Sequence, residues 1–350
     1  METAILPAPR YFSPCETGGG RIRCGLCPRR CLIAPGGFGN CGVRRNRNAA
    51  GDTPFSGVVT AMAADPIEKK PLYHFRPGSS VFSIGFAGCN LQCPFCQNWR
   101  ISQRSAAAPR LKRLSPAEVT ASARSMGLRQ IAYTYSEPLV HFEFLLDCMK
   151  LAREAGIANI IVSNGCVNKK PAAEILALTD AANIDLKAFS KKTYSSVLGG
   201  DLQTVLAFIE AAHAAGVHLE ITTLVVPGLN DSAKETADGA AFIAGVSRDI
   251  PWHLSAYHPD YRWAAPPTNK AALIRAVRRA REILHYVYIG NISGGPDSQE
   301  LHDTLCLHCG RILISRRGYK IDVGGLVQKE EAGGQSYCCA YCGAAAPIVS

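Results

Sequence analysis

The sequence lacks any apolar run long enough to cross a bilayer, and its start does not resemble that of an exported protein. A membrane-spanning helix needs about 20 apolar residues in succession. The opening stretch METAILPAPRYFSPCE has neither the basic start nor the apolar core of a signal peptide. We therefore expect a cytoplasmic protein that has no membrane partner.

Internal repeats and low-complexity tracts are missing too. The 350 residues are 47% hydrophobic and 19% charged, which is an ordinary globular composition. Acidic side chains are in the minority, with 28 Asp and Glu against 38 Lys and Arg and a formal net charge of +10. This excess favours acidic partners, such as an acidic electron-transfer protein or nucleic acid. A solvated basic surface would explain it equally well.

Cysteine, by contrast, is abundant. Of the fifteen cysteines, twelve fall into three clusters at positions 24–41, 89–96 and 306–342. Without a secretion signal, clustered cysteines indicate metal ligands rather than disulfides. The clusters supply four, three and four candidate ligands, and Cys15, Cys148 and Cys166 lie outside them.

The middle of the chain alternates between strand and helix patterns. Strands are predicted at 81–88, 130–136, 158–164, 181–188, 218–228, 251–259 and 286–292. Helices are predicted at 115–127, 139–156, 171–179, 201–216, 232–247 and 269–284, the first with Ser115 and Glu118 as a capping box. Such alternation favours right-handed βαβ units and a parallel sheet. We therefore predict an α/β fold with a partial or near-complete (β/α)6 TIM-like barrel.

The polar residues of this region test that prediction. In such barrels the chemistry lies at the carboxyl ends of the strands. Cys89, Glu137 and Asn164 each stand at the end of a predicted strand, and Asp185 and Lys187 stand late on the next one. The pattern agrees with a barrel, although a doubly wound sheet would show it as well.

The loop GFAGCNLQCPFCQNWRIS holds only three cysteines, Cys89, Cys93 and Cys96. A structural zinc site or an electron-transfer iron–sulfur cluster uses four ligands. Three thiolates on a four-iron cluster leave one iron open to a substrate or cofactor. A three-cysteine loop at a strand end therefore indicates catalysis.

The segment CNLQCPFC resembles the Cys-x3-Cys-x-aromatic-Cys signature of radical S-adenosylmethionine (SAM) enzymes. Nearly the whole chain resembles their AmmeMemoRadiSam group, which is related to pyruvate formate-lyase activating enzymes; CGLCPRRCLIAPGGFGNCGVRRN, YTYSEP, IDLKAF and PWHLSAYHPDYRW carry the likeness. The resemblance implies a 4Fe–4S cluster on Cys89, Cys93 and Cys96. It also implies reductive cleavage of SAM to a 5′-deoxyadenosyl radical, which abstracts a hydrogen atom from a substrate. A low-potential donor such as flavodoxin or ferredoxin would supply the electron.

The same resemblance suggests residues that contact SAM. Phe95 would lie by the adenine. Tyr135, Ser136 and Glu137 take the place of the Gly-Gly-Glu segment that binds the cofactor's amino group, and both glycines are replaced. Main-chain contacts survive that replacement.

On the next strands, Asn164, Asp185 and Lys187 are the remaining cofactor candidates. Asp185 and Lys187 share one face of their strand, where the resemblance places the methionine or ribose end of SAM. A purely structural ion pair is the alternative.

The two outer cysteine clusters each offer a closed set of four. Cys24, Cys27, Cys31 and Cys41 suit either zinc or an auxiliary iron–sulfur cluster, and the spacing does not choose between them. Cys306, Cys309, Cys339 and Cys342 form two Cys-x-x-Cys-Gly pairs, which predict a zinc ribbon. Cys338 competes with Cys339 as a ligand.

We thus divide the chain into a cysteine-rich module (1–50), a connection (51–79), a radical SAM barrel (80–295) and a zinc-ribbon-like module (300–350). The favoured function is a radical SAM enzyme that acts on a small molecule or a protein. One alternative is an activase for a glycyl-radical enzyme. The other is a non-catalytic, metal-rich nucleic-acid-binding protein, which we do not expect.

Overall fold

The computed structural model describes residues 8–15, 18–103, 111–292, 295, 297–331 and 334–350. The strands of its main sheet are β6 (Val58–Pro66), β7 (Ser80–Phe86), β8 (Lys112–Arg113), β9 (Gln130–Thr134), β10 (Ala158–Ser163), β11 (Ala181–Asp185), β12 (His218–Val225), β13 (Trp252–Ala256) and β14 (Val287–Gly290). The helices among them are η1 (Ile67–Lys69), α1 (Trp99–Ser102), α2 (Pro116–Ser125), η2 (Pro138–His141), α3 (Phe142–Glu154), α4 (Lys169–Leu176), α5 (Lys191–Thr193), the π-helical turn η3 (Tyr194–Leu198), α6 (Leu202–Ala214), α7 (Ala233–Val246) and α8 (Lys270–Arg281).

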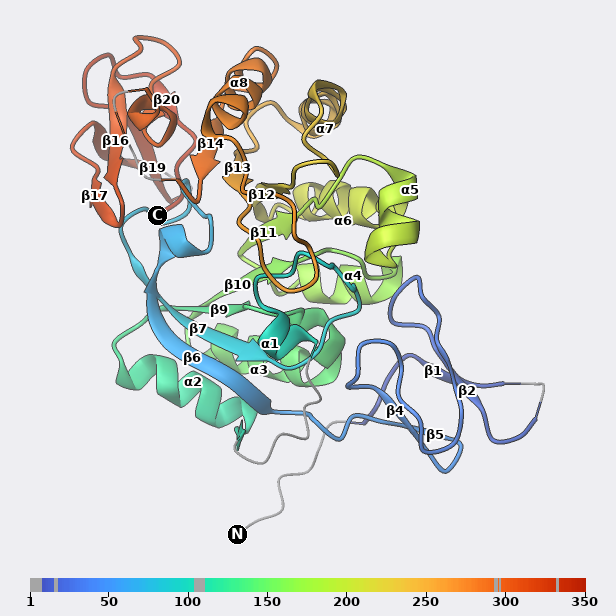
Figure 1. Ribbon diagram of the computed structural model, residues 1–350. Coiled ribbons are helices and arrows are strands. Elements are labelled where there is room, and N and C mark those ends of the chain that lie inside the picture. The colour runs from blue at the N-terminus through green and yellow to red at the C-terminus, as the bar shows by residue number, and fades with distance from the viewer. Residues whose placement is uncertain (1–7, 16–17, 104–110, 293–294, 296, 332–333) are drawn as a thin grey trace.

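These strands form one curved sheet in the order β14-β13-β12-β11-β10-β9-β7-β6-β8 (Figure 1). All neighbours from β14 to β7 are parallel, whereas β6 pairs antiparallel with both β7 and β8. Among the described residues β14 and β8 do not pair with each other. The sheet is therefore a partial barrel, open between its two edges, as the alternation of strands and helices predicts.

The predicted elements of the barrel are all present, with ends shifted by a few residues. The capping box also forms, because Ser115 Oγ accepts the N–H of Glu118 at 3.3 Å and Glu118 Oε2 accepts the N–H of Ser115 at 2.7 Å. The segment 51–79 proves to be more than a connection, since it supplies β6. Its Ala and Met residues are weak strand formers, so the strand depends on its pairing with β7.

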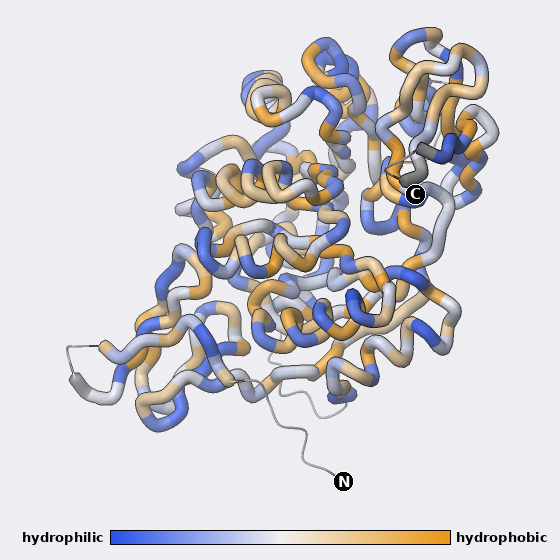
Figure 2. Tube along the Cα trace, turned by 180° about the vertical axis from the view of Figure 1, so that it is seen from behind, coloured by the Kyte–Doolittle hydropathy of each residue, from blue (hydrophilic) through white to orange (hydrophobic). Residues whose placement is uncertain are grey.

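The segment between η1 and β7 (residues 70–79), called the plugging segment below, fills the amino-terminal end of the barrel. Pro71 O accepts the side-chain N–H of Asn183 on β11 at 2.7 Å, and Glu220 Oε1 on β12 accepts the N–H of His74 at 2.7 Å. The helices cover the outer face, and seen from behind their coils alternate between hydrophobic and hydrophilic residues (Figure 2). No helix among the described residues is long and apolar enough to cross a membrane.

The amino-terminal module contains the short strands β1 (Phe12–Pro14), β2 (Ile22–Cys24), β3 (Leu32–Ile33), β4 (Arg45–Arg47) and β5 (Ala50–Asp52). A buried ion pair attaches it to α3. Arg44 donates from both terminal nitrogens to the two carboxylate oxygens of Glu143, at 2.9 and 3.0 Å. Both side chains are only 2% exposed. This bidentate geometry fixes the module in one orientation on the barrel.

The carboxyl-terminal module lies beside β14, at the opposite side of the molecule (Figure 1). It consists of η4 (Gln299–Leu301), β15 (Thr304–Leu305), β16 (Ile312–Arg317), β17 (Lys320–Asp322), β18 (Leu326–Glu331), β19 (Gly334–Cys339) and β20 (Ala345–Ala346). Arg316 donates to Tyr73 O at 2.8 Å, and the hydroxyls of Tyr288 and Thr304 share a hydrogen bond of 2.8 Å. The module is therefore bound to the plugging segment and to β14 together.

Replacing Glu143 by Gln tests the attachment of the amino-terminal module. The variant would keep the side-chain shape but leave the buried Arg44 charge without a carboxylate. We expect the free energy of unfolding, measured in urea, to fall by about 3–5 kcal/mol. Asp238→Asn is the control, because its partner Lys234 is exposed and the pair should contribute less than about 1 kcal/mol. Equal losses in the two variants would contradict this view of the interface.

Candidate active site

The three-cysteine loop joins β7 to α1 at the carboxyl end of the sheet, where the sequence predicts it. Cys89 Sγ accepts the N–H of Leu91 at 3.3 Å, and Cys96 Sγ lies 3.2 Å from Ser102 Oγ. Burial, together with the neighbouring Glu137 carboxylate and Cys93 thiolate, raises the pKa of Cys89 well above its usual range. Burial likewise raises the pKa of Cys93 to about 12. These thiols would become thiolates only with a cation in the loop, which suits metal ligands.

The spacing of these sulfurs bears on the kind of metal. A single ion at about 2.3 Å from each sulfur needs ligands within about 4.6 Å of one another. Among the described residues, only the four carboxyl-terminal cysteines bring three or more ligand atoms within 4.8 Å. The sulfurs of Cys89, Cys93 and Cys96 do not form a group of this kind in the described structure.

Glu137 ties the ends of β9 and β10 together. Its carboxylate accepts the N–H of Leu139 at 3.0 Å, the hydroxyl of Ser163 at 2.8 Å and the N–H of Asn164 at 2.8 Å. Burial raises the pKa of Glu137 to about 7, although these hydrogen bonds oppose the shift. The carboxyl group is therefore already held by the protein, and its contact with the cofactor amino group stays a prediction.

Asn164 reaches from the end of β10 to the cysteine loop. Its side-chain N–H group lies 3.6 Å from Cys89 Sγ and 2.9 Å from Asn90 Oδ1, and its Oδ1 accepts the N–H of Cys166 at 2.8 Å. Hydrogen bonds to cluster sulfurs tune the reduction potential. The sequence predicted Asn164 as a cofactor contact, and the structure gives it a position next to a cluster ligand.

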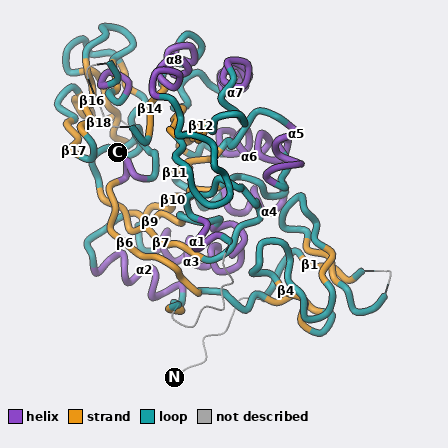
Figure 3. The backbone as a smooth tube through the Cα atoms, in the orientation of Figure 1, coloured by secondary structure: helices purple, strands orange, loops and turns teal. Residues whose placement is uncertain are grey.

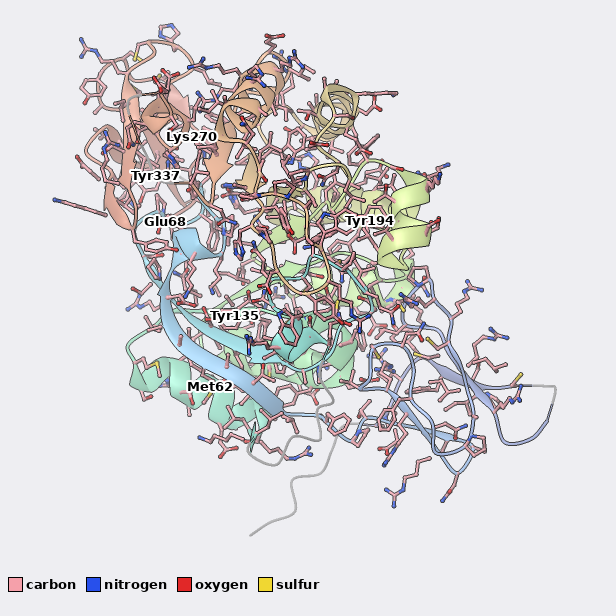
Figure 4. All side chains as sticks on the ribbon, in the orientation of Figure 1. Met62, Glu68, Tyr135, Tyr194, Lys270 and Tyr337 are labelled. Atoms are coloured by element: carbon pink, nitrogen blue, oxygen red, sulfur yellow. The ribbon has the colours of Figure 1, made fainter. Side chains whose placement is uncertain are left out.

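Tyr135 takes the backbone conformation that a glycine would adopt, with φ of +69°. Left-handed backbone is unfavourable for a tyrosine, and two contacts offset this cost. Its hydroxyl donates to Asp65, and Lys70 Nζ lies 4.3 Å from the ring centroid (Figure 4). Ser136 donates from Oγ to Phe86 O at 2.6 Å. Both side chains are therefore engaged with the protein, which leaves their main chain as the surface for a ligand.

Asp185 and Lys187 form an ion pair at 3.0 Å, with side chains 28% and 19% exposed. Burial opposes the charge on Lys187, yet Asp185 and the thiolates of Cys93 and Cys96 raise its pKa. The pair thus stands beside the cysteine loop and retains accessible surface. This placement agrees with a role in cofactor binding, although it does not exclude a structural ion pair.

Phe95 packs into the main hydrophobic core and is 2% exposed. Its ring therefore offers little surface to an adenine in this conformation. Any contact at this position would come from the backbone of the loop.

The loop after β13 covers the cysteine loop (Figure 3). Trp99 Nε1 donates to Asp260 Oδ1 at 3.0 Å, and its ring stacks on Tyr261 at 5.3 Å between centroids. The N–H of Arg262 donates to Pro94 O at 2.9 Å. The aromatic residues in HPDYRW and QNWRIS were the available signal, but their pairing depends on the tertiary fold.

The four amino-terminal cysteines, Cys24, Cys27, Cys31 and Cys41, line a common small void together with Asn90. The amino-terminal module contacts the three-cysteine loop directly. Arg29 Nε donates to Asn90 O at 2.7 Å, and a Cβ placed on Gly88 would lie 2.4 Å from Cys41 O. No three of these four sulfurs lie within 4.8 Å of one another.

The carboxyl-terminal cysteines meet as predicted. The sulfurs of Cys306, Cys309, Cys339 and Cys342 all lie within 4.8 Å of one another. Two pairs, Cys306–Cys342 and Cys309–Cys339, are separated by 3.7 Å, close to the ~3.8 Å edge of a tetrahedron with metal–sulfur bonds of about 2.3 Å. Cys338 is not in this group, because its Sγ lies 3.5 Å from Val327 O. The set can bind a metal, and Cys339 is the member that the sequence left open.

Comparisons with known proteins assign the family. The radical SAM superfamily profile matches residues 83–240, which include the three-cysteine loop. An uncharacterized protein of Methanocaldococcus jannaschii, MJ0808, is 38% identical over 299 residues, or 85% of this chain and 88% of the relative. The chain belongs to the radical SAM superfamily. This confirms the resemblance seen in the sequence at the level of the superfamily.

Other radical SAM proteins match a smaller part of the chain. A pyruvate formate-lyase-activating enzyme of Clostridium pasteurianum is 28% identical over 180 residues, covering 50% of this chain and 74% of that enzyme. A solved domain of pyruvate-formate lyase-activating enzyme from Bacteroides vulgatus is 22% identical with a TM-score of 0.41, covering 46% of this chain and 98% of the domain.

Metal analysis of cysteine variants tests the carboxyl-terminal site. Cys309→Ser removes one of four converging sulfurs, and we expect the full-length protein to lose about one equivalent of non-iron metal by mass spectrometry. Cys338→Ser is the matched control and should keep that metal, because its sulfur points to a backbone carbonyl. Loss of metal in the Cys338 variant alone would reverse the ligand assignment.

Proposed function

We propose that this protein is a radical SAM enzyme of the AmmeMemoRadiSam group, which cleaves SAM reductively and abstracts a hydrogen atom from a substrate. The main support is the loop with Cys89, Cys93 and Cys96, which lies at the carboxyl end of β7 next to Lys187. A 4Fe–4S cluster on this loop would keep one iron free for SAM and, when reduced, would supply the electron that cleaves it.

The protein residues have separate tasks in this proposal. Cys89, Cys93 and Cys96 hold the cluster, and Asn164 adjusts its potential through the contact with Cys89. The positive charge of Lys187 stabilises the thiolates. The loop after β13, which covers the cysteine loop through Arg262 and Tyr261, limits access of water and oxygen.

SAM would bind across the carboxyl ends of β9, β10 and β11. The main chain at Tyr135 and Ser136 would accept the cofactor's ammonium group, with Glu137 behind it. Asp185 would bind the ribose or methionine end, a role suited to a carboxylate that stays partly exposed. These assignments follow the resemblance and the positions of the strand ends.

We further propose an auxiliary iron–sulfur cluster on Cys24, Cys27, Cys31 and Cys41. The support is that all four cysteines line one void, which also reaches Asn90 of the three-cysteine loop. A reduced flavodoxin or ferredoxin would be the external donor, and the basic charge excess would favour such an acidic partner. Zinc is proposed for the carboxyl-terminal set, where the sulfurs approach tetrahedral spacing.

A cytoplasmic location is part of the same proposal, because free thiols on this scale belong in a reducing compartment. A nucleic-acid-binding role has less support. Of the basic residues in the carboxyl-terminal module, Arg316 is 2% exposed and Arg317 pairs with Asp303 at 3.0 Å. Arg316 therefore offers almost no surface to a nucleic acid, and the charge of Arg317 is already paired.

The cluster assignment is tested by a triple variant in which Cys89, Cys93 and Cys96 become Ala. Anaerobically reconstituted wild-type protein should show a 4Fe–4S spectrum that changes when SAM is added. The triple variant should lose this change and also the dithionite-driven formation of 5′-deoxyadenosine. Cys148→Ala, which removes a cysteine buried in α3 away from the loop, should retain both. Formation of 5′-deoxyadenosine by the triple variant would refute the proposal.

The identity of the target is tested by electron paramagnetic resonance. The reduced enzyme, SAM and host extract would be incubated with isotopically labelled glycine in the extract proteins. We expect no stable glycyl radical, because the covering loop after β13 and the two outer modules favour a small or peptide-borne substrate over the radical loop of a large enzyme. A glycyl doublet on a second protein would establish the alternative, an activase.

A further inference from the structure

A cavity lies at the open side of the barrel. It has a volume of about 690 Å³, within the range of small-molecule sites. Its walls come from four parts of the chain: η1 and the plugging segment, strands β13 and β14 with the residues just after β14, the η4 segment with Gln299 and His302, and β16 with the turn that follows it. In Figure 4, Glu68 marks its position between β6 and the carboxyl-terminal module. The barrel and this module therefore enclose the space jointly.

Three buried polar atoms around the cavity have no hydrogen-bond partner among the described residues. They are Glu68 Oε2, His302 Nε2 and Arg316 Nε, and each of these side chains lines the cavity. Buried polar atoms are nearly always paired, because each unpaired one costs about 1–3 kcal/mol. Because all three side chains line the same space, that space is the candidate position for a ligand or ordered water.

Arg316 is the distinctive member of this set. The residue is 2% exposed, yet no carboxylate of a described residue lies within 4.0 Å of its guanidinium group. Its terminal nitrogens instead donate to neutral oxygens: Tyr73 O at 2.8 Å, His302 O at 3.0 Å and Thr304 Oγ1 at 2.8 Å. Its guanidinium carbon lies 4.1 Å from the ring centroid of Tyr73. Buried charges are normally paired, so this arginine lacks an anion.

The other charges near the cavity do not supply that anion. Lys69 and Lys70 share a single carboxylate, Asp65, at 2.8 and 2.7 Å. Glu220 is occupied by His253, at 2.6 Å. Glu68 is the remaining acidic side chain of the wall, and its distance from Arg316 exceeds that of an ion pair. Lys69, Lys70 and Arg316 thus balance Asp65, Glu68 and Glu220 in number, and Arg316 is the one of these cations that has no carboxylate of a described residue within 4.0 Å.

The cavity also lies close to the proposed cofactor site. Thr222 pairs with Asp185 on one side and with His253 on the other, so that all three stand in one cross-strand row. Neighbouring strands are about 4.8 Å apart, which places Asp185 roughly 10 Å from the cavity wall. A molecule that fills the cavity would extend towards that row along the inner face of the barrel.

We propose that this cavity binds the substrate, and that the substrate is a small molecule whose carboxylate or phosphate group pairs with Arg316. The inference rests on the proposed radical SAM function and adds a substrate class to it. It also gives the carboxyl-terminal module a part in recognition, because Arg316 and Tyr319 belong to that module.

Inorganic phosphate and acetate serve as separate probes for the two kinds of anion. Their apparent dissociation constants would be measured on full-length, anaerobically reconstituted protein from shifts in the thermal unfolding midpoint, with ionic strength held constant by sodium chloride. We expect at least one probe to bind about tenfold or more weakly to Arg316→Gln than to wild type. Arg317→Gln is the matched control and should bind as wild type, because that residue is outside the cavity wall and pairs with Asp303.

A second variant guards against a simple folding defect in Arg316→Gln. Glu68→Gln removes a negative charge from the same wall while keeping an oxygen for the N–H of Gly78. It should bind the anion several-fold more tightly than wild type, which a purely structural role would not predict. Equal responses of all variants, or no response to either anion, would overturn the proposal. SAM cleavage by the same wild-type preparation is scored separately, so a failure of the cavity proposal is distinguishable from a failure of the radical SAM function.

Discussion

The candidate site depends on one buried carboxylate. Glu137 accepts hydrogen bonds from Leu139, Ser163 and Asn164, and so holds the ends of two adjacent parallel strands in register. Asn164, once fixed in this way, reaches the cysteine loop through Cys89. The geometry of the three thiols is therefore set by strand ends that are far apart in the sequence, and a flexible loop alone would not maintain it.

Much of this arrangement could be predicted from the sequence, because the relevant signals are local. The period of the helices and the length of the apolar runs locate the barrel elements, and the spacing of the cysteines locates the four carboxyl-terminal residues that can bind a metal. The carboxyl-end rule of parallel sheets then places Asp185 and Lys187 near Cys89. Each of these inferences uses only residues that are neighbours along the chain or a general rule of the fold.

What the sequence could not predict depends on tertiary contacts. β6 becomes a strand because it pairs with β7. Tyr135 adopts a glycine-like backbone because Asp65 and Lys70 hold its side chain. Arg316 lies in a basic stretch of sequence, yet it is buried against Tyr73. No periodicity or motif encodes such pairings between distant segments.

The position of β14 at one edge of the sheet has a consequence for the stability of the protein in the cell. An unprotected edge strand exposes N–H and C=O groups that can pair with another chain. Here η4 and the carboxyl-terminal module stand beside that edge, with Thr304 hydrogen-bonded to Tyr288. Proteolytic loss of the module would uncover β14, so a truncated product would be prone to aggregate through edge-to-edge pairing.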